Sequence, residues 1–268
     1  MSILTLGPAG TYCHRVSLSI SDDISFRNSV NAIVKEVSDG TFSNGVIPVE
    51  NSIEGSVTES LSCLVNHDVS VLKEVVAPIR HSLLAQSSNF NTIMSHPQAL
   101  AQCRNFINSE YPNLKLEPTT STATGILRAT EDKTVAAIGH HQSSTEKLKI
   151  LAKNIQDQST NSTRFFVIAP SEQRQLSGKK TSVIIYPRSD YSGLLLEILQ
   201  TFAAQNINLT RIESRPSGNK LGDYLFHIDF EASSDENRTV DVFSNLRSII
   251  SKNGWIRSLG SYDVTYLS

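Results

Sequence analysis

The stretch APSEQRQLSGKK, residues 169–180, divides the sequence into two parts with different patterns. It is polar and contains Pro, Gly and two adjacent lysines, a composition typical of a segment between domains. Before it, short apolar runs alternate with segments of helical periodicity, and after it the pattern changes. We therefore predict a body over residues 1–170, a linker over residues 171–180 and a second module over residues 181–268.

The C-terminal part predicts a small α+β module. TSVIIYP (181–187) is typical of a buried strand, and SGLLLEILQTFAAQ (192–205) of an amphipathic helix that Ser192 can cap. Two strands around a Ser-Gly-Asn turn come next, followed by a second helix over residues 240–254 and a last strand over residues 255–267. The order βαββαβ is that of the ferredoxin-like fold.

The body reads as an α/β sheet. NSVNAIVKEVSDG (28–40) carries apolar residues at i, i+3, i+4 and i+7, which predicts a helix with Asn28 or Ser29 as its cap and Gly40 beyond its end. Strand-like runs precede and follow this helix, and the alternation continues up to the run RFFVI (164–168). Strands that alternate with helices favour an α/β architecture.

Composition excludes several classes of protein. Lys and Arg number 24 against 26 Asp and Glu, so the chain lacks the basic excess that nucleic-acid binding requires. No apolar run approaches the eighteen or so residues of a membrane span, and the start does not resemble a signal peptide. The three cysteines are widely spaced, without a C-x-x-C pair, which favours a reduced, cytoplasmic protein. The charge balance and the absence of a long apolar run predict that it binds neither nucleic acid nor membrane.

NSTRFFVI, residues 161–168, places Thr163 and Arg164 where a buried strand begins. Taken alone, Thr163 closes a loop, and Arg164 braces the strand through an ion pair. The alternative is that both side chains face a cleft and act on a ligand. The pair His140-His141 reads as solvated surface on a polar helix, since two ligands are too few for a closed metal shell.

Several blocks in register resemble the prephenate dehydratase family. They are GPAGTYCH (7–14), IPVENSIEGSV (47–57), SHPQALAQC (95–103) and IQDQSTNSTRF (155–165), while residues 193–216 resemble the ACT regulatory module attached to such enzymes. The resemblance covers nearly the whole chain. It departs from the family at Tyr12-Cys13, where Phe-Ser is usual.

The resemblance implies a two-lobed body like a type II periplasmic binding protein, joined to the ferredoxin-like ACT module. Residues 69–86 would cross between the lobes, and the segment before Asn161 would return. The implied enzyme is a monofunctional, decarboxylating carbon–oxygen lyase that converts prephenate into phenylpyruvate. The expulsion of water and carbon dioxide is driven by aromatisation, so no cofactor is expected, and the sequence shows neither a phosphate-cradling loop nor a metal-ligand cluster.

The resemblance also implies the residues of the active site. Thr163 would be essential to catalysis, and Glu50 is the candidate for a true general acid. The expected catalytic residues are Thr163, Glu50, Asn51, Ser95 and Gln102; the expected substrate-binding residues are Thr11, Ser52, His96, Thr122 and Arg164. The helix N-termini after GPAGT and after TTST (119–122) are candidate sites for the two carboxylates of the substrate.

In the family the ACT module binds phenylalanine between subunits and slows the enzyme. The resemblance assigns that pocket to Gly193, Leu194, Leu195, Asn208, Leu209, Glu213, Ser214, Arg215 and Pro216. A lone module of this type leaves a sheet edge uncovered, so a homodimer or homotetramer is expected. Two alternatives stay open: an arogenate dehydratase, and a two-lobed amino-acid sensor without turnover, which would not need the Thr163 hydroxyl.

Overall fold

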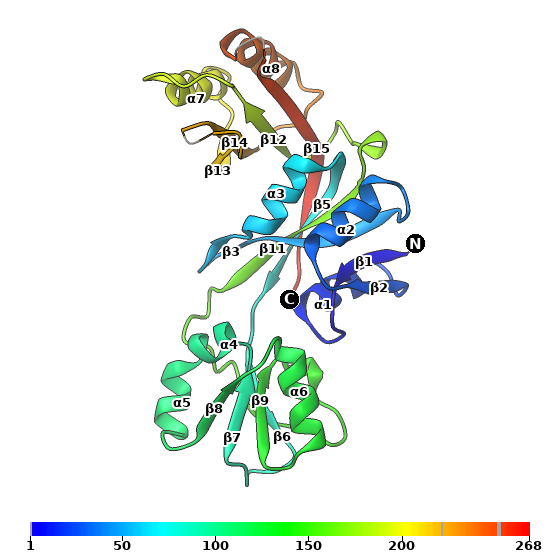
Figure 1. Cartoon of the computed structure of the whole chain (residues 1–268), viewed down its shortest axis with the longest axis vertical. Helices are drawn as coiled ribbons and strands as arrows, with labels where there is room; N and C mark the ends of the chain where they lie inside the picture. Colours follow the sequence, from blue (N-terminus) through cyan, green and yellow to red (C-terminus); the bar gives the residue numbers. More distant parts are fainter. Residues whose placement is uncertain (1, 221, 251–252) are drawn as a thin grey trace.

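The computed structural model describes residues 2–220, 222–250 and 253–268, which form two lobes and a C-terminal module (Figure 1). The first lobe is built on a sheet with the order β5-β11-β3-β1-β2. Its strands are β1 (Ile3–Leu6), β2 (Ile24–Arg27), β3 (Asn44–Asn51), the short β4 (Gly55–Ser56) that pairs with β3, β5 (Val69–Pro78) and β11 (Ser162–Pro170).

Helices cover both faces of this sheet. They are α1 (Tyr12–Leu18), α2 (Val30–Ser38) and α3 (Thr58–Asn66). Helix α2 is the one that the periodicity predicted: Ser29 caps it, accepting a hydrogen bond from the Ala32 N–H over 3.2 Å, and its apolar stripe is buried. These buried residues pack with α3 into one core, while α1 packs on the other face around Val16 and Phe165.

The second lobe has a five-stranded sheet of its own, with the order β10-β6-β9-β7-β8. Its elements are β6 (Ser82–Ala85), β7 (Thr92–Ser95), α4 (Pro97–Gln102), α5 (Arg104–Glu110), β8 (Lys115–Pro118), α6 (Thr122–Glu131), β9 (Val135–Gly139), the 3₁₀ turn His141–Ser143 and β10 (Lys149–Lys153). The chain enters this lobe between β5 and β6 and leaves it between β10 and β11. Both predicted crossings are confirmed.

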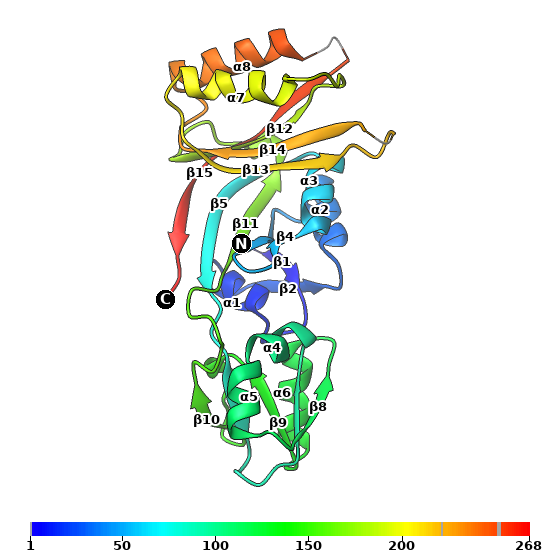
Figure 2. The same ribbon diagram turned by 90° about the vertical axis from the view of Figure 1, so that its left-hand side faces the viewer.

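The C-terminal module has the predicted order βαββαβ. It consists of β12 (Lys180–Tyr186), α7 (Leu194–Ala204), β13 (Leu209–Pro216), β14 (Tyr224–Phe230), α8 (Asn237–Ile249) and β15 (Trp255–Tyr266). Both helices lie on the face of the sheet that points away from the body (Figure 2). The expected Ser192 cap is wrong, because Gly193 holds that position with φ at 97°. Of the predicted second helix, residues 251 and 252 lie outside the described residues.

Strand β15 ties the module to the body. Residues 255–262 pair with β12, and residues 263–266 pair in parallel with β5, so the two sheets are continuous. The segment 171–180 packs against this strand: a Cβ on Gly178 would lie 2.4 Å from the backbone nitrogen of Tyr262. A core cluster that contains Leu64 of α3 together with Ile184 and Tyr262 spans the junction. In the part of the chain that the structure describes, no helix is long and apolar enough to cross a membrane.

Candidate active site

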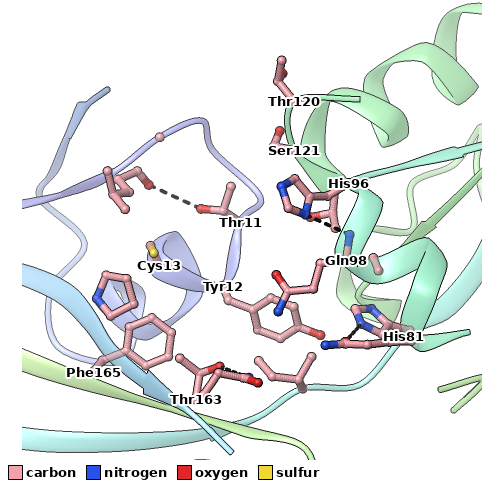
Figure 3. Close-up of a pocket in the computed structure, with 18 residues that line it drawn as sticks. Thr11, Tyr12, Cys13, His81, His96, Gln98, Thr120, Ser121, Thr163 and Phe165 are labelled. Atoms are coloured by element: carbon pink, nitrogen blue, oxygen red, sulfur yellow. Dashed lines mark hydrogen bonds between the residues drawn. The ribbon is translucent and has the colours of Figure 1, made fainter. Parts of the chain in front are cut away.

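A cavity of about 360 Å³ lies where the two lobes meet (Figure 3). The first lobe contributes the loop before α1 and the ends of β3 and β11, and the second lobe contributes α4 and the start of α6. Six of the ten residues that the sequence predicted for catalysis and substrate binding line it: Thr11, Asn51, His96, Gln102, Thr122 and Thr163. Residues that are far apart in the sequence therefore meet at one site.

The Thr163 hydroxyl has a defined hydrogen-bond role. The Oδ1 atom of Asn51 accepts the backbone N–H groups of Ile53 (3.0 Å) and Glu54 (3.1 Å), so the amide nitrogen Nδ2 must point the other way. That nitrogen donates to Thr163 Oγ1 over 2.9 Å. Since the oxygen accepts this bond, the hydroxyl proton is left for a group in the cavity.

The hydrogen bonds continue from Asn51 into the second lobe. Asn51 Nδ2 also donates to Asn161 Oδ1 over 2.9 Å, and Asn161 Nδ2 donates to Gln102 Oε1 over 3.1 Å. The same oxygen lies 2.9 Å from His81 Nε2, which must therefore be the protonated ring nitrogen. Burial lowers the pKa of His81, which keeps the imidazole neutral. The chain of polar groups fixes the relative position of both lobes at the cavity.

Sequence reasoning missed Asn161 and His81. Asn161 stands inside the block that contains Thr163, so its position was available as a signal. His81 lies in the crossing between β5 and β6, outside every recognised block, and only the fold brings it to the cavity.

Tyr12 connects α1 to the same crossing. Its hydroxyl donates to the Arg80 carbonyl over 2.6 Å and accepts a hydrogen bond from the Arg80 N–H over 2.9 Å. The hydroxyl proton is therefore not available to a ligand. Burial raises the pKa of Tyr12, which stays a neutral phenol. Burial likewise raises the pKa of Cys13 to about 12, so this thiol is neutral too. Tyr12 is thus a structural anchor at the crossing between the lobes.

The prediction for His140 is wrong. His140 follows β9 and is buried, with its ring 5.8 Å from that of Tyr12 in an edge-on contact. No polar helix forms there: a short 3₁₀ turn leads towards β10. Burial, together with the neighbouring Arg15, lowers the pKa of His140 to about 3. The residue packs between the lobes as a neutral ring.

Two helices begin at the cavity, as the sequence predicted. Thr11 caps α1 by accepting the His14 N–H over 3.3 Å, and Ser121 caps α6 by accepting the Thr124 N–H over 3.0 Å. His96 caps α4 through Nδ1, which accepts the Gln98 N–H over 3.3 Å. Figure 3 shows the three caps around the same space. Helix N-termini carry free N–H groups and a positive dipole end, which suit an anionic ligand.

The expected placement of Glu50 and Arg164 in this cavity is wrong. Successive residues of a strand point to opposite faces, so Glu50 faces away where Asn51 faces the cavity, and Arg164 faces away where Thr163 does. Glu50 is bound to Arg164 over 2.5 Å on that other face. Arg164 therefore has the bracing role that was the alternative, and Glu50 is not positioned as an acid for this cavity.

Ser52 and Ser95 also lie outside the cavity lining. The Ser52 hydroxyl accepts the Ser162 N–H over 3.0 Å and borders a different hollow on the side facing the module. Ser95 is fully buried, and its hydroxyl donates to the Ile138 carbonyl over 2.7 Å. Both hydroxyls brace the backbone next to residues that do face the cavity.

The nine residues predicted for the regulatory pocket are divided between two faces of the module. Glu213 and Arg215 face the body, where Glu213 accepts from the Ser56 hydroxyl and Arg215 lies 3.3 Å from Ser62 Oγ. Ser214 is exposed on the opposite face, which carries α7. Within one chain, therefore, Glu213 and Arg215 lie on the other face of β13 from Ser214, and the lining of a pocket between subunits stays a prediction.

The other six are placed around α7 and the ends of β13. Leu194 is buried in the module core, whereas Leu195 on the next position is exposed. Gly193 caps α7, and Asn208 donates to Glu231 over 2.9 Å. Leu209 and Pro216 are the two ends of β13.

Comparison with known proteins agrees with this architecture. The sequence model of the family described as prephenate dehydratase matches residues 3–173, and that of the ACT domain matches residues 189–248. The prephenate dehydratase of Methanocaldococcus jannaschii is 37% identical over 268 residues, covering 96% of both chains. A protein of Arabidopsis thaliana named arogenate dehydratase/prephenate dehydratase 1, chloroplastic, is 35% identical over 81% of this chain and 60% of its own.

A solved structure extends the agreement to three dimensions. The prephenate dehydratase of Arthrobacter aurescens in complex with L-Phe superposes with a TM-score of 0.87 at 29% identity, covering 98% of this chain and 90% of the other. Sequence and fold coincide over nearly the full length. The chain belongs to the prephenate dehydratase family.

Proposed function

We propose that the protein converts prephenate into phenylpyruvate, water and carbon dioxide. The observation that carries the proposal is the Thr163 hydroxyl at the cavity between the lobes, held as an acceptor by Asn51 and thereby free to donate. Family membership supports the same conclusion. The proposed catalytic domain covers residues 1–170, with a linker over residues 171–180 and an ACT domain over residues 181–268.

The reaction needs a donor more than a base. As the bond between the ring and its carboxylate breaks, the electron pair of that bond moves into the ring, the ring hydroxyl leaves, and the ring becomes aromatic. The departing oxygen gathers negative charge and ends as water, so each turnover consumes one proton. The Thr163 hydroxyl is placed to donate a hydrogen bond to this oxygen as the charge builds.

A single positioned donor has a large expected effect on the rate. Donation or transfer of a proton by a positioned group contributes about 10²–10⁴-fold, and one transition-state donor contributes about 3 kcal/mol. Asn51 and, through it, Asn161 and Gln102 keep the donor in place before the substrate arrives. Catalysis by this site is therefore positioning and electrostatic stabilisation, carried by neutral side chains.

The substrate carboxylates require anchors, and the cavity offers them. The first turn of α6, with Ser121 as its cap and Thr122 next to it, lines the cavity, and His96 lies beside Ser121 (Figure 3). Hydrogen bonds to a charged group contribute roughly 1.5–3 kcal/mol each. Thr11 adds a hydroxyl from the first lobe.

For the module we propose binding of L-phenylalanine as a feedback inhibitor, between paired modules. Support comes from the relative from A. aurescens, which was solved with L-Phe. Gly193, Leu195 and Ser214 are the predicted residues that stay open to a ligand on the face that carries α7. A glycine at this turn lets the backbone approach an amino acid closely.

We further propose that copies of the chain, in the cytoplasm, pair through the module into a dimer or tetramer. Strand β13 is the terminal strand of its sheet, and its Ile212 is 44% exposed. Leu195 and Leu196 on α7 are exposed as well. An open strand edge beside apolar side chains is the kind of surface that a second copy covers. Light scattering after size exclusion measures the mass of the assembly directly.

A direct assay tests the proposed activity. The protein is incubated with prephenate at neutral pH, where prephenate alone is stable enough for a blank, and phenylpyruvate is measured, with arogenate in parallel. Phenylpyruvate from prephenate supports the proposal. Turnover of arogenate alone would assign the arogenate activity that the A. thaliana relative's name includes, and binding without turnover of either would leave the amino-acid sensor.

A further inference from the structure

Arg164 joins three strands on the face of the first-lobe sheet that points away from the cavity. Its guanidinium contacts Glu50 of β3 over 2.5 Å, Glu74 of β5 over 2.7 Å and Asp229 of β14 over 2.8 Å. Lys180 of β12 contacts Glu74 over 3.0 Å. We refer to these five residues as the junction cluster. Asp229 and Lys180 belong to the module, so the cluster connects the module to the body.

The cluster is buried and charged. The side chains of Glu74 and Asp229 are 2% and 4% exposed, and that of Arg164 is 15% exposed. Burial acts to raise the pKa of Asp229, yet Arg164 and Arg211 hold it below its ordinary value. Asp229 Oδ1 in addition accepts the Ser182 hydroxyl over 2.6 Å. A buried guanidinium bound by several carboxylates in a planar fork leaves little freedom for Arg164 to move.

Arg164 directly follows Thr163 on β11. In the register of β11 with β3, Thr163 lies opposite Asn51 and Arg164 lies opposite Glu50. The donor and the residue that orients it are thus each adjacent in sequence to a member of the junction cluster. The pairing with β5 is regular from Ser162 to Val167, whereas the pairing with β3 is irregular directly after Arg164, so on the β3 side the position of Arg164 is set by its side-chain contacts as well as by the ladder.

We propose that Asp229 is a positioning residue for the dehydration: through Arg164 it holds Thr163 at the angle that the reaction requires. Because the peptide unit is rigid, a displacement of the Arg164 Cα is passed to Thr163 one residue away. The residues that line the cavity all come from the two lobes, and the Asp229–Arg164 ion pair is a direct side-chain contact between β14 and the residue next to Thr163. The inference rests on the proposed function.

A purely structural role makes a different prediction. If the Asp229–Arg164 pair only fastens the module to the body, its loss lowers stability while folded enzyme retains its kcat. If the pair positions Thr163, the loss lowers kcat in enzyme that is fully folded, and KM changes little, because the anchors for the carboxylates lie in the second lobe and at Thr11.

The experiment compares kcat and KM for prephenate in the full-length chain and three variants. Asp229→Asn keeps the shape and removes the charge, and Ser182→Ala is a milder change that withdraws the hydroxyl from Asp229 Oδ1. Lys180→Met is the matched control, since Lys180 contacts Glu74 and, in the described part of the chain, forms no side-chain hydrogen bond or ion pair with β11. Circular dichroism melts establish that each variant is folded at the assay temperature.

We expect kcat to fall roughly ten- to a hundredfold in Asp229→Asn and roughly two- to tenfold in Ser182→Ala. KM should stay within about threefold, and Lys180→Met should keep its kcat within about twofold. If the wild type is active and folded Asp229→Asn has an unchanged kcat, the inference is overturned and the proposed function stands. Where Asp229→Asn does not fold, an unchanged kcat in Ser182→Ala has the same consequence. A wild type that makes no phenylpyruvate overturns the proposed function and, with it, the inference.

Discussion

The Nδ2 atom of Asn51 lies 2.9 Å from Thr163 Oγ1 and donates to it, while the Oδ1 atom of Asn51 is held by two backbone N–H groups. This arrangement decides the direction of the hydrogen bond, and with it the direction in which the threonine proton points. A threonine is a feeble acid in solution, and its use as a donor depends on such positioning. The two residues come from antiparallel strands, β3 and β11, and lie opposite each other in the register of this pair.

Asn51→Asp should reverse this bond. The Oδ1 contacts to Ile53 and Glu54 remain possible, but a carboxylate has no proton to donate, so the Thr163 hydroxyl would turn towards it. We expect kcat for prephenate to fall roughly a hundredfold in a folded protein. The control is Asn89→Asp, the same change at an exposed loop position outside the cavity lining. Comparable rates in Asn51→Asp and wild type would contradict the assigned direction.

Ser214→Leu should weaken phenylalanine binding without loss of basal turnover. Ser214 is exposed on the face of β13 that carries α7, so a larger side chain fills the proposed pocket and disturbs no core contact. Leu194→Ala is a poorer test, since Leu194 is buried and its truncation costs about 2–5 kcal/mol of stability. Calorimetric titration with phenylalanine measures the change in affinity. The control is Ser248→Leu, at an exposed position of α8. An unchanged affinity for phenylalanine in Ser214→Leu would exclude the face of β13 that carries α7 as the binding site.

Stability should fall in acid partly because of His227. Burial, with Arg211 nearby, lowers the pKa of this histidine from 6.5 to about 3. Between these values the unfolded chain binds a proton that the folded protein does not bind. The free energy of unfolding therefore decreases as pH falls through this window, by at most about 1.4 kcal/mol per pH unit for this one group.

His227→Gln removes that titration. Urea unfolding at pH 7, 6 and 5 should show a shallower loss of stability for the variant than for the wild type, by up to about one proton's slope. His67→Gln, at a partly exposed position, serves as control. Identical slopes for the wild type and His227→Gln would show that the buried ring is not kept neutral.

Gly178→Ala should destabilise the protein although the position lies in a polar segment. The new Cβ would meet the backbone of Tyr262 at 2.4 Å, which forces the segment and β15 apart. Overpacking of this kind costs about 1–3 kcal/mol. Thermal melting compared with Ser177→Ala, an exposed neighbour, measures it. A melting temperature equal to that of the control would mean that residues 171–180 do not pack on β15.

Local sequence patterns predicted the order of the helices and strands, but they predicted the residues of the site only in part. The apolar stripe of α2, the cap at Ser29 and the βαββαβ order are local properties that a sequence carries. The alternation of strand residues also predicts that Thr163 and Arg164 face opposite sides, and this signal was available but not used. Which carboxylates Arg164 meets depends on Glu74 and Asp229, 90 and 65 residues away.

Long-range pairing also explains the other differences. His81, His140 and Tyr12 come together because the chain crosses twice between the lobes, and no local periodicity encodes such a meeting. The last strand was predicted as part of the module, which its first eight residues are, but its end pairs with β5 of the body. Side chains alternate between the two faces along the whole length of β15, both where it pairs with β12 and where it pairs with β5. The sequence pattern therefore does not show where the pairing partner changes.

The hydroxyl of Thr163 itself is tested most directly by replacing it without changing the shape of the side chain. Thr163→Val replaces the hydroxyl with a methyl group of similar size, whereas Thr163→Ser keeps the hydroxyl. The measurement is kcat for prephenate in the two variants and the wild type, in protein shown to be folded. The account predicts that Thr163→Ser retains part of the activity and that Thr163→Val loses about a hundredfold or more. A valine variant as fast as wild type would contradict it.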